Sequence, residues 1–71
     1  MLNILGAQKV RLNRKGLTEI PIERCNGQLV LLDLKFNYIS QIAKIENFIF
    51  LKYLDLEGNR IVDISGLNQN L

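Results

Sequence analysis

The sequence contains no histidine and no tryptophan, and it has only one cysteine and one proline. Histidine is the most frequent general base and a common metal ligand. A catalytic site or a metal site in this chain would therefore lack its most usual residue. Cys25 cannot form a disulfide within the chain, and without histidine it cannot build a typical metal site. The sequence therefore predicts no metal, no cofactor and no enzymatic activity.

Long apolar runs and an excess of one charge are also missing. No stretch reaches the roughly 18 apolar residues of a membrane span, so we expect no membrane insertion. Nine basic and seven acidic residues leave a net charge of +2, too small to indicate binding to nucleic acid. The basic residues are concentrated in residues 1–28, and this uneven placement favours a polarised binding face.

The 71 residues do contain an internal repeat with a period of 22. The second and third copies agree at eight positions, where Leu29, Leu32, Asp33, Leu34, Asn37, Ile39, Ile42 and Ile45 correspond to Leu51, Leu54, Asp55, Leu56, Asn59, Ile61, Ile64 and Leu67. One period earlier, the same apolar positions hold Val10, Leu12, Leu17 and Ile20. A repeat at fixed spacing predicts stacked copies of one structural unit.

The segments 29–39 and 51–61, LVLLDLKFNYI and LKYLDLEGNRI, resemble the leucine-rich-repeat family. The 22-residue period with late isoleucines is similar to the SDS22-like subclass. The resemblance implies a leucine-rich-repeat solenoid that binds other proteins. That subclass is intracellular and includes phosphatase regulators and an axonemal dynein light chain. Extracellular members of the family usually have cysteine-rich caps. The resemblance and the lone cysteine predict an intracellular, cytoplasmic protein, with a cytoskeletal, ciliary or nuclear location as the alternatives.

The spacing within each copy predicts an α/β fold. Leu32 and Leu34 alternate, so both point to one side of a short strand. Stacked copies form a short parallel sheet on the concave face, with loops or 3-10 and other short helical turns on the convex face. Asn37 and Asn59 follow the strands, where their amides can bond the backbone of neighbouring turns. We interpret both asparagines as structural.

We expect a single domain over residues 1–71, with residues 1–6 as an N-terminal cap. The repeats are 7–28, 29–50 and 51–71, the last incomplete. The first repeat departs from the pattern, as a terminal repeat often does. Lys15 replaces the asparagine, while Ile20, Ile22 and Cys25 are expected to fill the interior.

Outward strand positions form columns that we predict to bind a protein partner. The first column is Lys9, Leu31 and Tyr53, the second is Arg11, Asp33 and Asp55, and the third is Asn13, Lys35 and Glu57, with Phe36 beside them. The simpler interpretation is an ordinary exposed strand face, with Arg11 pairing across the sheet with Asp33. Two other surfaces remain open: the C-terminal end around Ile61, Ile64 and Leu67, and a lateral surface that includes Tyr38 and Arg60.

Three functions compete. The first is a protein-interaction module or scaffold subunit that uses the concave face. The second is a structural piece of a longer array or assembly, docking further repeats through its C-terminal end. The third is RNA binding through Lys9, Arg11, Arg14 and Lys15. Paired carboxylates at Asp33 and Asp55 could raise one pKa, but no nucleophile motif accompanies them.

Overall fold

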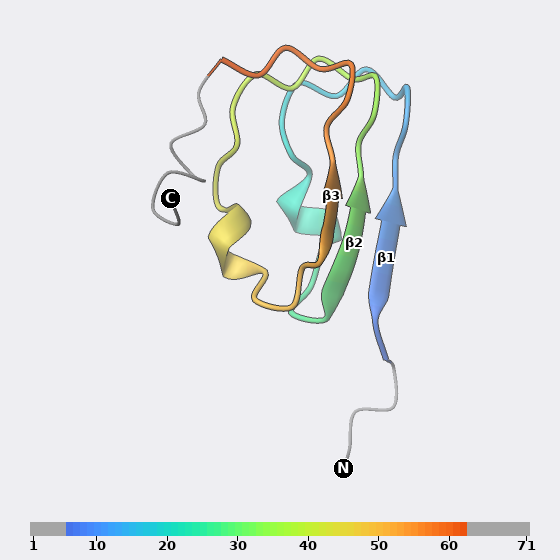
Figure 1. Ribbon diagram of the computed structural model, residues 1–71, viewed down its shortest axis with the longest axis vertical. Coiled ribbons are helices and arrows are strands. Elements are labelled where there is room, and N and C mark those ends of the chain that lie inside the picture. Colours follow the sequence, from blue (N-terminus) through green and yellow to red (C-terminus); the bar gives the residue numbers. More distant parts are fainter. Residues whose placement is uncertain (1–5, 63–71) are drawn as a thin grey trace.

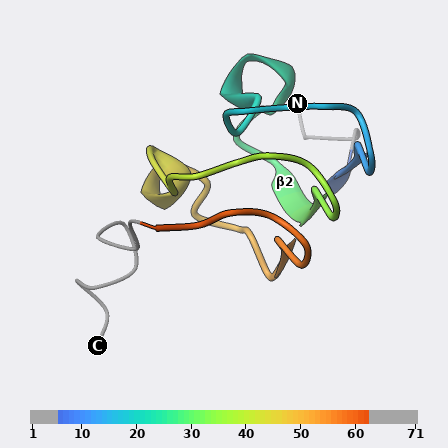
Figure 2. The same cartoon turned by 90° about the horizontal axis from the view of Figure 1, so that it is seen from above.

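The strands pair in parallel and lie in the sheet in their order along the chain (Figure 1). The computed structural model describes residues 6–62. They contain the strands β1 (Gln8–Arg11), β2 (Leu29–Asp33) and β3 (Tyr53–Asp55), and the 3-10 helices η1 (Ile22–Arg24) and η2 (Ile45–Asn47). Figure 2 shows successive turns of the chain lying next to one another. The parallel sheet and the short helical turns of the sequence prediction are confirmed.

The core lies between the sheet and the return segments that carry η1 and η2. Leu29 and Leu32 on β2, Leu34 directly after it, and Ile39 on the return path are fully buried. We call the repeats over residues 7–28, 29–50 and 51–71 the first, second and third units. Ile42 and Ile45 pack into the core from the return segment of the second unit, and Ile20 packs into it from the return segment of the first unit. Burying one such side chain contributes about 1.5–3 kcal/mol. Ile39, Ile42 and Ile45, which are spaced three residues apart, are all buried, so one side of the return path faces the core.

The first unit fills its interior with different residues. Ile20 and Pro21 are buried, and Ile22 and Cys25 are half-buried. Glu23, at the position equivalent to Ile45, is exposed instead. Burial raises the pKa of the Cys25 thiol, and the nearby Glu23 charge adds to this effect. Cys25 is thus kept in the thiol form and acts as a small packing residue.

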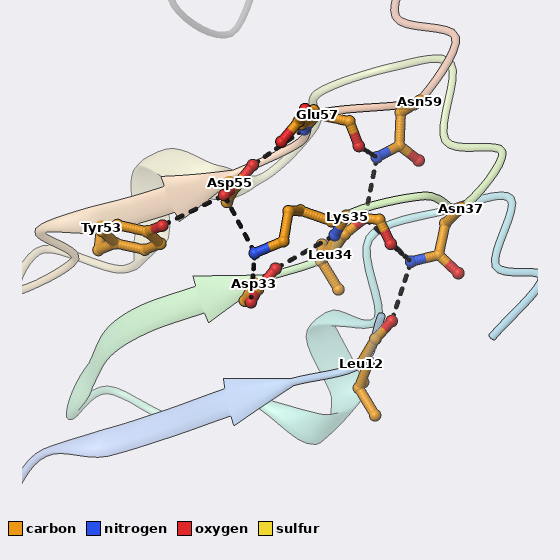
Figure 3. A network of polar contacts seen from close by, with 9 residues as sticks. All are labelled: Leu12, Asp33, Leu34, Lys35, Asn37, Tyr53, Asp55, Glu57 and Asn59. Carbon is orange, nitrogen blue, oxygen red and sulfur yellow. Dashed lines mark hydrogen bonds and ion pairs between the residues drawn. The ribbon is translucent and has the colours of Figure 1, made fainter. Parts of the chain in front are cut away.

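Asn37 connects the first unit to the second through its side-chain amide (Figure 3). It is 2% exposed. Its Oδ1 accepts hydrogen bonds from the backbone N–H groups of Lys15 at 2.9 Å and Leu17 at 3.0 Å. Its Nδ2 donates to the carbonyl oxygens of Leu12 and Leu34, both at 2.9 Å. One side chain therefore satisfies four backbone groups from two neighbouring turns.

Asn59 repeats this arrangement one unit later. Its Nδ2 donates to the carbonyls of Leu34 at 2.8 Å and Leu56 at 3.0 Å, and its Oδ1 accepts from Ile39 N–H at 2.9 Å. Each asparagine thus reaches back to the preceding turn. The equivalent position in the first unit holds Lys15, whose backbone N–H is one of the groups that Asn37 bonds.

Several predicted features lie outside the described residues. Residues 1–5 of the expected cap, and Ile64 and Leu67 of the third repeat, are among them. Within the described part, the inward-facing Leu54, Leu56 and Ile61 are only half-buried, whereas their equivalents in the second unit are fully buried.

Candidate functional site

The sheet register brings the predicted partner-binding residues into columns. Lys9 pairs with Leu31, and Leu31 with Tyr53, across the three strands. Arg11 pairs with Asp33, and Asp33 with Asp55, in the same way. These residues alternate with the core-facing Val10, Leu32 and Leu54, so they belong to the outer face of the sheet. We call this surface, which also includes Asn13, Lys35 and Glu57 just beyond the strands, the outer sheet face.

The sequence predicts Asp33 as an exposed partner-binding residue, but in the structure it is buried, with 6% of its surface exposed. Lys35 covers it, with Nζ 3.0 Å from Asp33 Oδ2, and the Lys35 backbone N–H donates to Asp33 Oδ1 at 3.2 Å. Asn13, with its amide nitrogen turned toward Asp33, donates to Oδ1 at 2.6 Å. The carboxylate thus has partners on several sides and serves as the centre of a network, not as a free contact residue.

Lys35 also joins β2 to β3. Its Nζ lies 3.4 Å from Asp55 Oδ2, and the Tyr53 hydroxyl donates to the same oxygen at 3.2 Å (Figure 3). The Glu57 backbone N–H donates to Asp55 Oδ1 at 3.0 Å, which repeats the turn seen at Asp33 and Lys35. Tyr53, Asp55, Lys35 and Asp33 therefore form one polar network across two strands, which we call the outer-face network.

The predicted pair between Arg11 and Asp33 is wrong. Lys35 supplies the cation instead, and among residues 6–62 Arg11 forms no ion pair and is exposed. The reason is local geometry. Lys35 is two residues beyond Asp33 on the same chain, in a turn that already bonds the Asp33 carboxylate through the backbone.

The outer-face network shifts the pKa of each of its ionisable members. Burial raises the pKa of Asp33, but hydrogen bonds from Lys35 and Asn13 and the Lys35 charge outweigh it and leave the pKa below 3.8. The Glu57 backbone N–H, with Tyr53 and Lys35, lowers the pKa of Asp55 in spite of some desolvation. Asp33 raises the pKa of Lys35 chiefly by hydrogen bonding, and Asp55 does the same for Tyr53.

These shifts predict a loss of stability in acid. A carboxylate whose pKa is lower in the folded chain stabilises the fold above its unfolded pKa, here near 3.8, and this contribution disappears as pH falls through the folded value. The raised pKa values of Tyr53 and Lys35 act oppositely, so their contribution is lost as pH rises above about 10. Urea unfolding followed by circular dichroism from about pH 2 to 11 measures both limits.

The control is the variant Asp33→Asn/Asp55→Asn, which removes both carboxylates. It should be less stable at neutral pH and should lose less stability than the natural sequence between neutral pH and about pH 3. If the two proteins lose the same stability in acid, other carboxylates cause the acid sensitivity.

Phe36 lies past the end of β2, in a turn with φ +60°. The Arg14 guanidinium carbon lies 4.3 Å from the centre of its ring, and Arg60 lies over Tyr38 at 5.0 Å. Sequence reasoning missed both contacts. The signal was present, because each pair is separated by one 22-residue period, which places its members side by side.

Other chemistry is sparse in the described part of the chain. A cavity of about 460 Å³ opens on the return side between residues 18–23 and 40–44, and none of the predicted partner-binding residues lines it. Among residues 6–62 no three histidine, cysteine or acidic side chains gather as a metal site would require. The same residues include no helix with the length and apolar character to cross a membrane.

Comparison with known proteins gives an informative likeness. No protein-family model and no solved structure matches the chain. The chain is 40% identical over 65 residues to the human protein named Leucine-rich repeat-containing protein 49. The match covers 92% of this chain and 10% of that protein, so the chain spans about a tenth of the length of this curated relative. Together with the 22-residue repeat and the parallel sheet, this similarity supports the interpretation that the chain is a leucine-rich repeat protein.

Proposed function

We propose that this chain is a protein-interaction module that binds a partner protein through the outer sheet face. In this proposal the chain is a leucine-rich-repeat solenoid of the SDS22-like subclass, and the outer sheet face is its concave surface. The observation that carries the proposal is the single surface formed by the columns, with Tyr53 48% exposed beside half-buried Leu31. The module is proposed to be intracellular and to catalyse no reaction.

The chemistry of this face suits a protein partner. Tyr53 and Leu31 are adjacent across the sheet and supply an apolar centre, while Lys9, Arg11 and Glu57 are exposed around it. Aromatic residues surrounded by polar groups are typical of interface centres. The named relative is a leucine-rich repeat-containing protein, and a general protein-binding role agrees with that name.

The outer-face network gives this surface a fixed shape. Tyr53 is hydrogen-bonded to Asp55, and Asp55 to Lys35, so the Tyr53 ring and the Lys35 chain are already ordered without a partner. Ordering a long side chain on binding costs about 0.5–1.5 kcal/mol, and a preformed network reduces this cost. The face can therefore bind with little rearrangement.

Lysine-directed cross-linking in an extract of the native source identifies the partner and the surface together. Lys9 and Lys35 report on the outer sheet face, and Lys44, beside η2, reports on the return side. Cross-links from Lys9 and Lys35 to one dominant protein support the proposal. Cross-links to that protein from Lys44 alone contradict it.

Tyr53→Ala is expected to weaken binding of the identified partner by at least about tenfold, equivalent to about 1.4 kcal/mol. The substitution removes the exposed ring and leaves the Lys35 ion pairs in place. Calorimetric titration with the purified partner measures the change. The matched control is Phe50→Ala, since Phe50 is 50% exposed and lies outside the outer sheet face. Equal affinities of the natural chain and Tyr53→Ala would contradict the proposed face.

A second candidate is a structural piece that docks further repeats against β3. It is favoured by the half-buried Leu54, Leu56 and Ile61, whose fully buried equivalents in the second unit are covered by the third. A parallel strand edge with incompletely covered apolar side chains favours pairing with another strand. In the cross-linking experiment this candidate predicts links only to other leucine-rich-repeat segments.

A further inference from the structure

Two arginine–aromatic pairs lie on the turns that follow the strands. Arg14 stacks over Phe36, and Arg60 over Tyr38, with guanidinium-to-ring distances of 4.3 and 5.0 Å. In each pair the arginine and the aromatic residue occupy equivalent positions of adjacent units. We call these four residues the arginine–aromatic row. The four residues belong to the turns that follow the carboxyl ends of the strands, and these turns are near the top of Figure 1.

The backbone holds the row in place. Arg14, Phe36 and Gly58 occupy equivalent turn positions, and all three have positive φ values, of 56°, 60° and 76°. Arg14 N–H donates to the Lys35 carbonyl at 3.0 Å, and Phe36 N–H donates to the Glu57 carbonyl at 2.8 Å. The side chains of the row thus project from turns that are hydrogen-bonded to one another, so their spacing is set by the stacking of the units.

Both arginines retain capacity to bind a carboxylate. A guanidinium stacked flat on a ring keeps its N–H groups at its edge, where they can grip a carboxylate in a bidentate manner. Arg14 and Arg60 are exposed. In residues 6–62 the ion pairs are those of Lys35 with Asp33 and Asp55, so neither arginine is paired with a carboxylate there.

We propose that the arginine–aromatic row binds an acidic segment of a protein, with carboxylates of Asp or Glu side chains on Arg14 and Arg60. The two arginines come from the first and third units. Across the units they are separated by two strand spacings of about 4.8 Å, and along the turn Arg60 lies two residues beyond the position equivalent to Arg14. Each guanidinium group reaches over a ring of the second unit. An extended peptide spans about 10 Å in three residues, so a peptide with acidic residues at regular short intervals can present carboxylates to both guanidinium groups. This inference is independent of the proposed use of the outer sheet face.

A single-stranded nucleic acid fits the row less well. Such ligands stack bases on open aromatic faces. Phe36 has Arg14 over its ring, and the ring also lies so close to Gly58 that a Cβ there would be 2.3 Å from it. The accessible chemistry is therefore the guanidinium edge and not a ring face.

The experiment measures fluorescence anisotropy of a labelled 12-residue peptide with Glu at every third position and Gly and Ser between, titrated with the full chain. A peptide with Gln in place of Glu is the matched ligand control. Binding of the Glu peptide and a loss of at least about tenfold in Arg14→Gln/Arg60→Gln is expected, since two bidentate contacts are removed. Arg14→Lys/Arg60→Lys keeps the charge without the planar fork, and it is expected to bind with intermediate affinity.

The control variant Lys44→Gln/Lys52→Gln removes the same charge at positions near η2 and before β3, away from the row (Figure 1). It should keep affinity within about twofold, because screened charges at a distance contribute little. Equal losses in the arginine and lysine variants would show general charge attraction and overturn the proposal. Equal affinity for the Glu and Gln peptides, or tighter binding of a 12-nucleotide oligouridylate, would also overturn it. Circular dichroism of each variant establishes that it is folded.

Discussion

Asn37→Ala is expected to lower the free energy of unfolding by about 3–5 kcal/mol, because it leaves buried backbone groups without partners at about 1–3 kcal/mol for each group. The groups that lose their bond to Asn37 are the N–H groups of Lys15 and Leu17 and the carbonyl of Leu12, whereas the Leu34 carbonyl keeps its bond from Asn59. Domains have only about 0.05–0.15 kcal/mol of stability per residue, so this loss removes much of the total. Urea unfolding followed by circular dichroism measures it.

Two further variants test the explanation. Asn59→Ala should lower the free energy of unfolding by less than Asn37→Ala. Asn59 is half-buried, and its Oδ1 accepts one hydrogen bond, from Ile39 N–H, whereas the Oδ1 of Asn37 accepts two. Asn37→Asp keeps an acceptor oxygen but turns a carboxylate oxygen toward the carbonyls of Leu12 and Leu34, so at neutral pH it should cost at least as much stability as Asn37→Ala. Equal losses for Asn37→Ala and Asn59→Ala would contradict the role given to burial and bond number.

Gly58→Ala has the second largest expected effect. Gly58 has φ +76°, and a side chain in this left-handed region costs about 1–2 kcal/mol. The added Cβ would also clash with Cδ1 of the Phe36 ring, so the ring must move from its position under Arg14. Overpacking of this kind typically costs a further 1–3 kcal/mol or so. Urea unfolding should therefore show a loss of about 2–5 kcal/mol in total.

The chain offers matched controls for the two contributions. Gly16 has φ +73° but nothing within 4 Å of the position that an added methyl group would occupy, so Gly16→Ala reports the backbone cost alone. The double variant Gly58→Ala/Phe36→Ala removes the ring that the methyl group would strike. Its loss of stability should be smaller than the sum of the two single losses by about 1 kcal/mol or more, as expected for residues in contact. Additive losses would mean that the methyl group and the ring do not compete for space.

Much of the fold follows from the 22-residue period. Alternation at Leu32 and Leu34 determines which strand face is buried, and a constant offset of one period determines which residues pair between strands. The threefold spacing of Ile39, Ile42 and Ile45 predicts inward side chains on an irregular return path. These features depend on local geometry and on the separation of apolar from polar residues, both of which can be read directly from a repeating sequence.

The candidate site was predictable in position but not in its interactions. The period places Asp33 between Arg11 and Asp55, and on charge alone an Arg11–Asp33 pair is reasonable. The structure pairs Asp33 with Lys35, because the turn after β2 brings that lysine back over the carboxylate. Which of two nearby cations reaches an anion depends on turn geometry and side-chain reach, and the pattern of residues contains neither.

By itself, the sequence determined the repeat, the parallel pairing and the residues that face the core, because periodic apolar positions allow few other ways to bury them. The tertiary structure alone decided that Asp33 is buried, that Asn37 bridges backward to the preceding turn, and that Arg14 and Arg60 stack on Phe36 and Tyr38. These contacts join residues about one period apart. Their existence depends on the distance and direction between side chains, which only the stacking of complete units establishes.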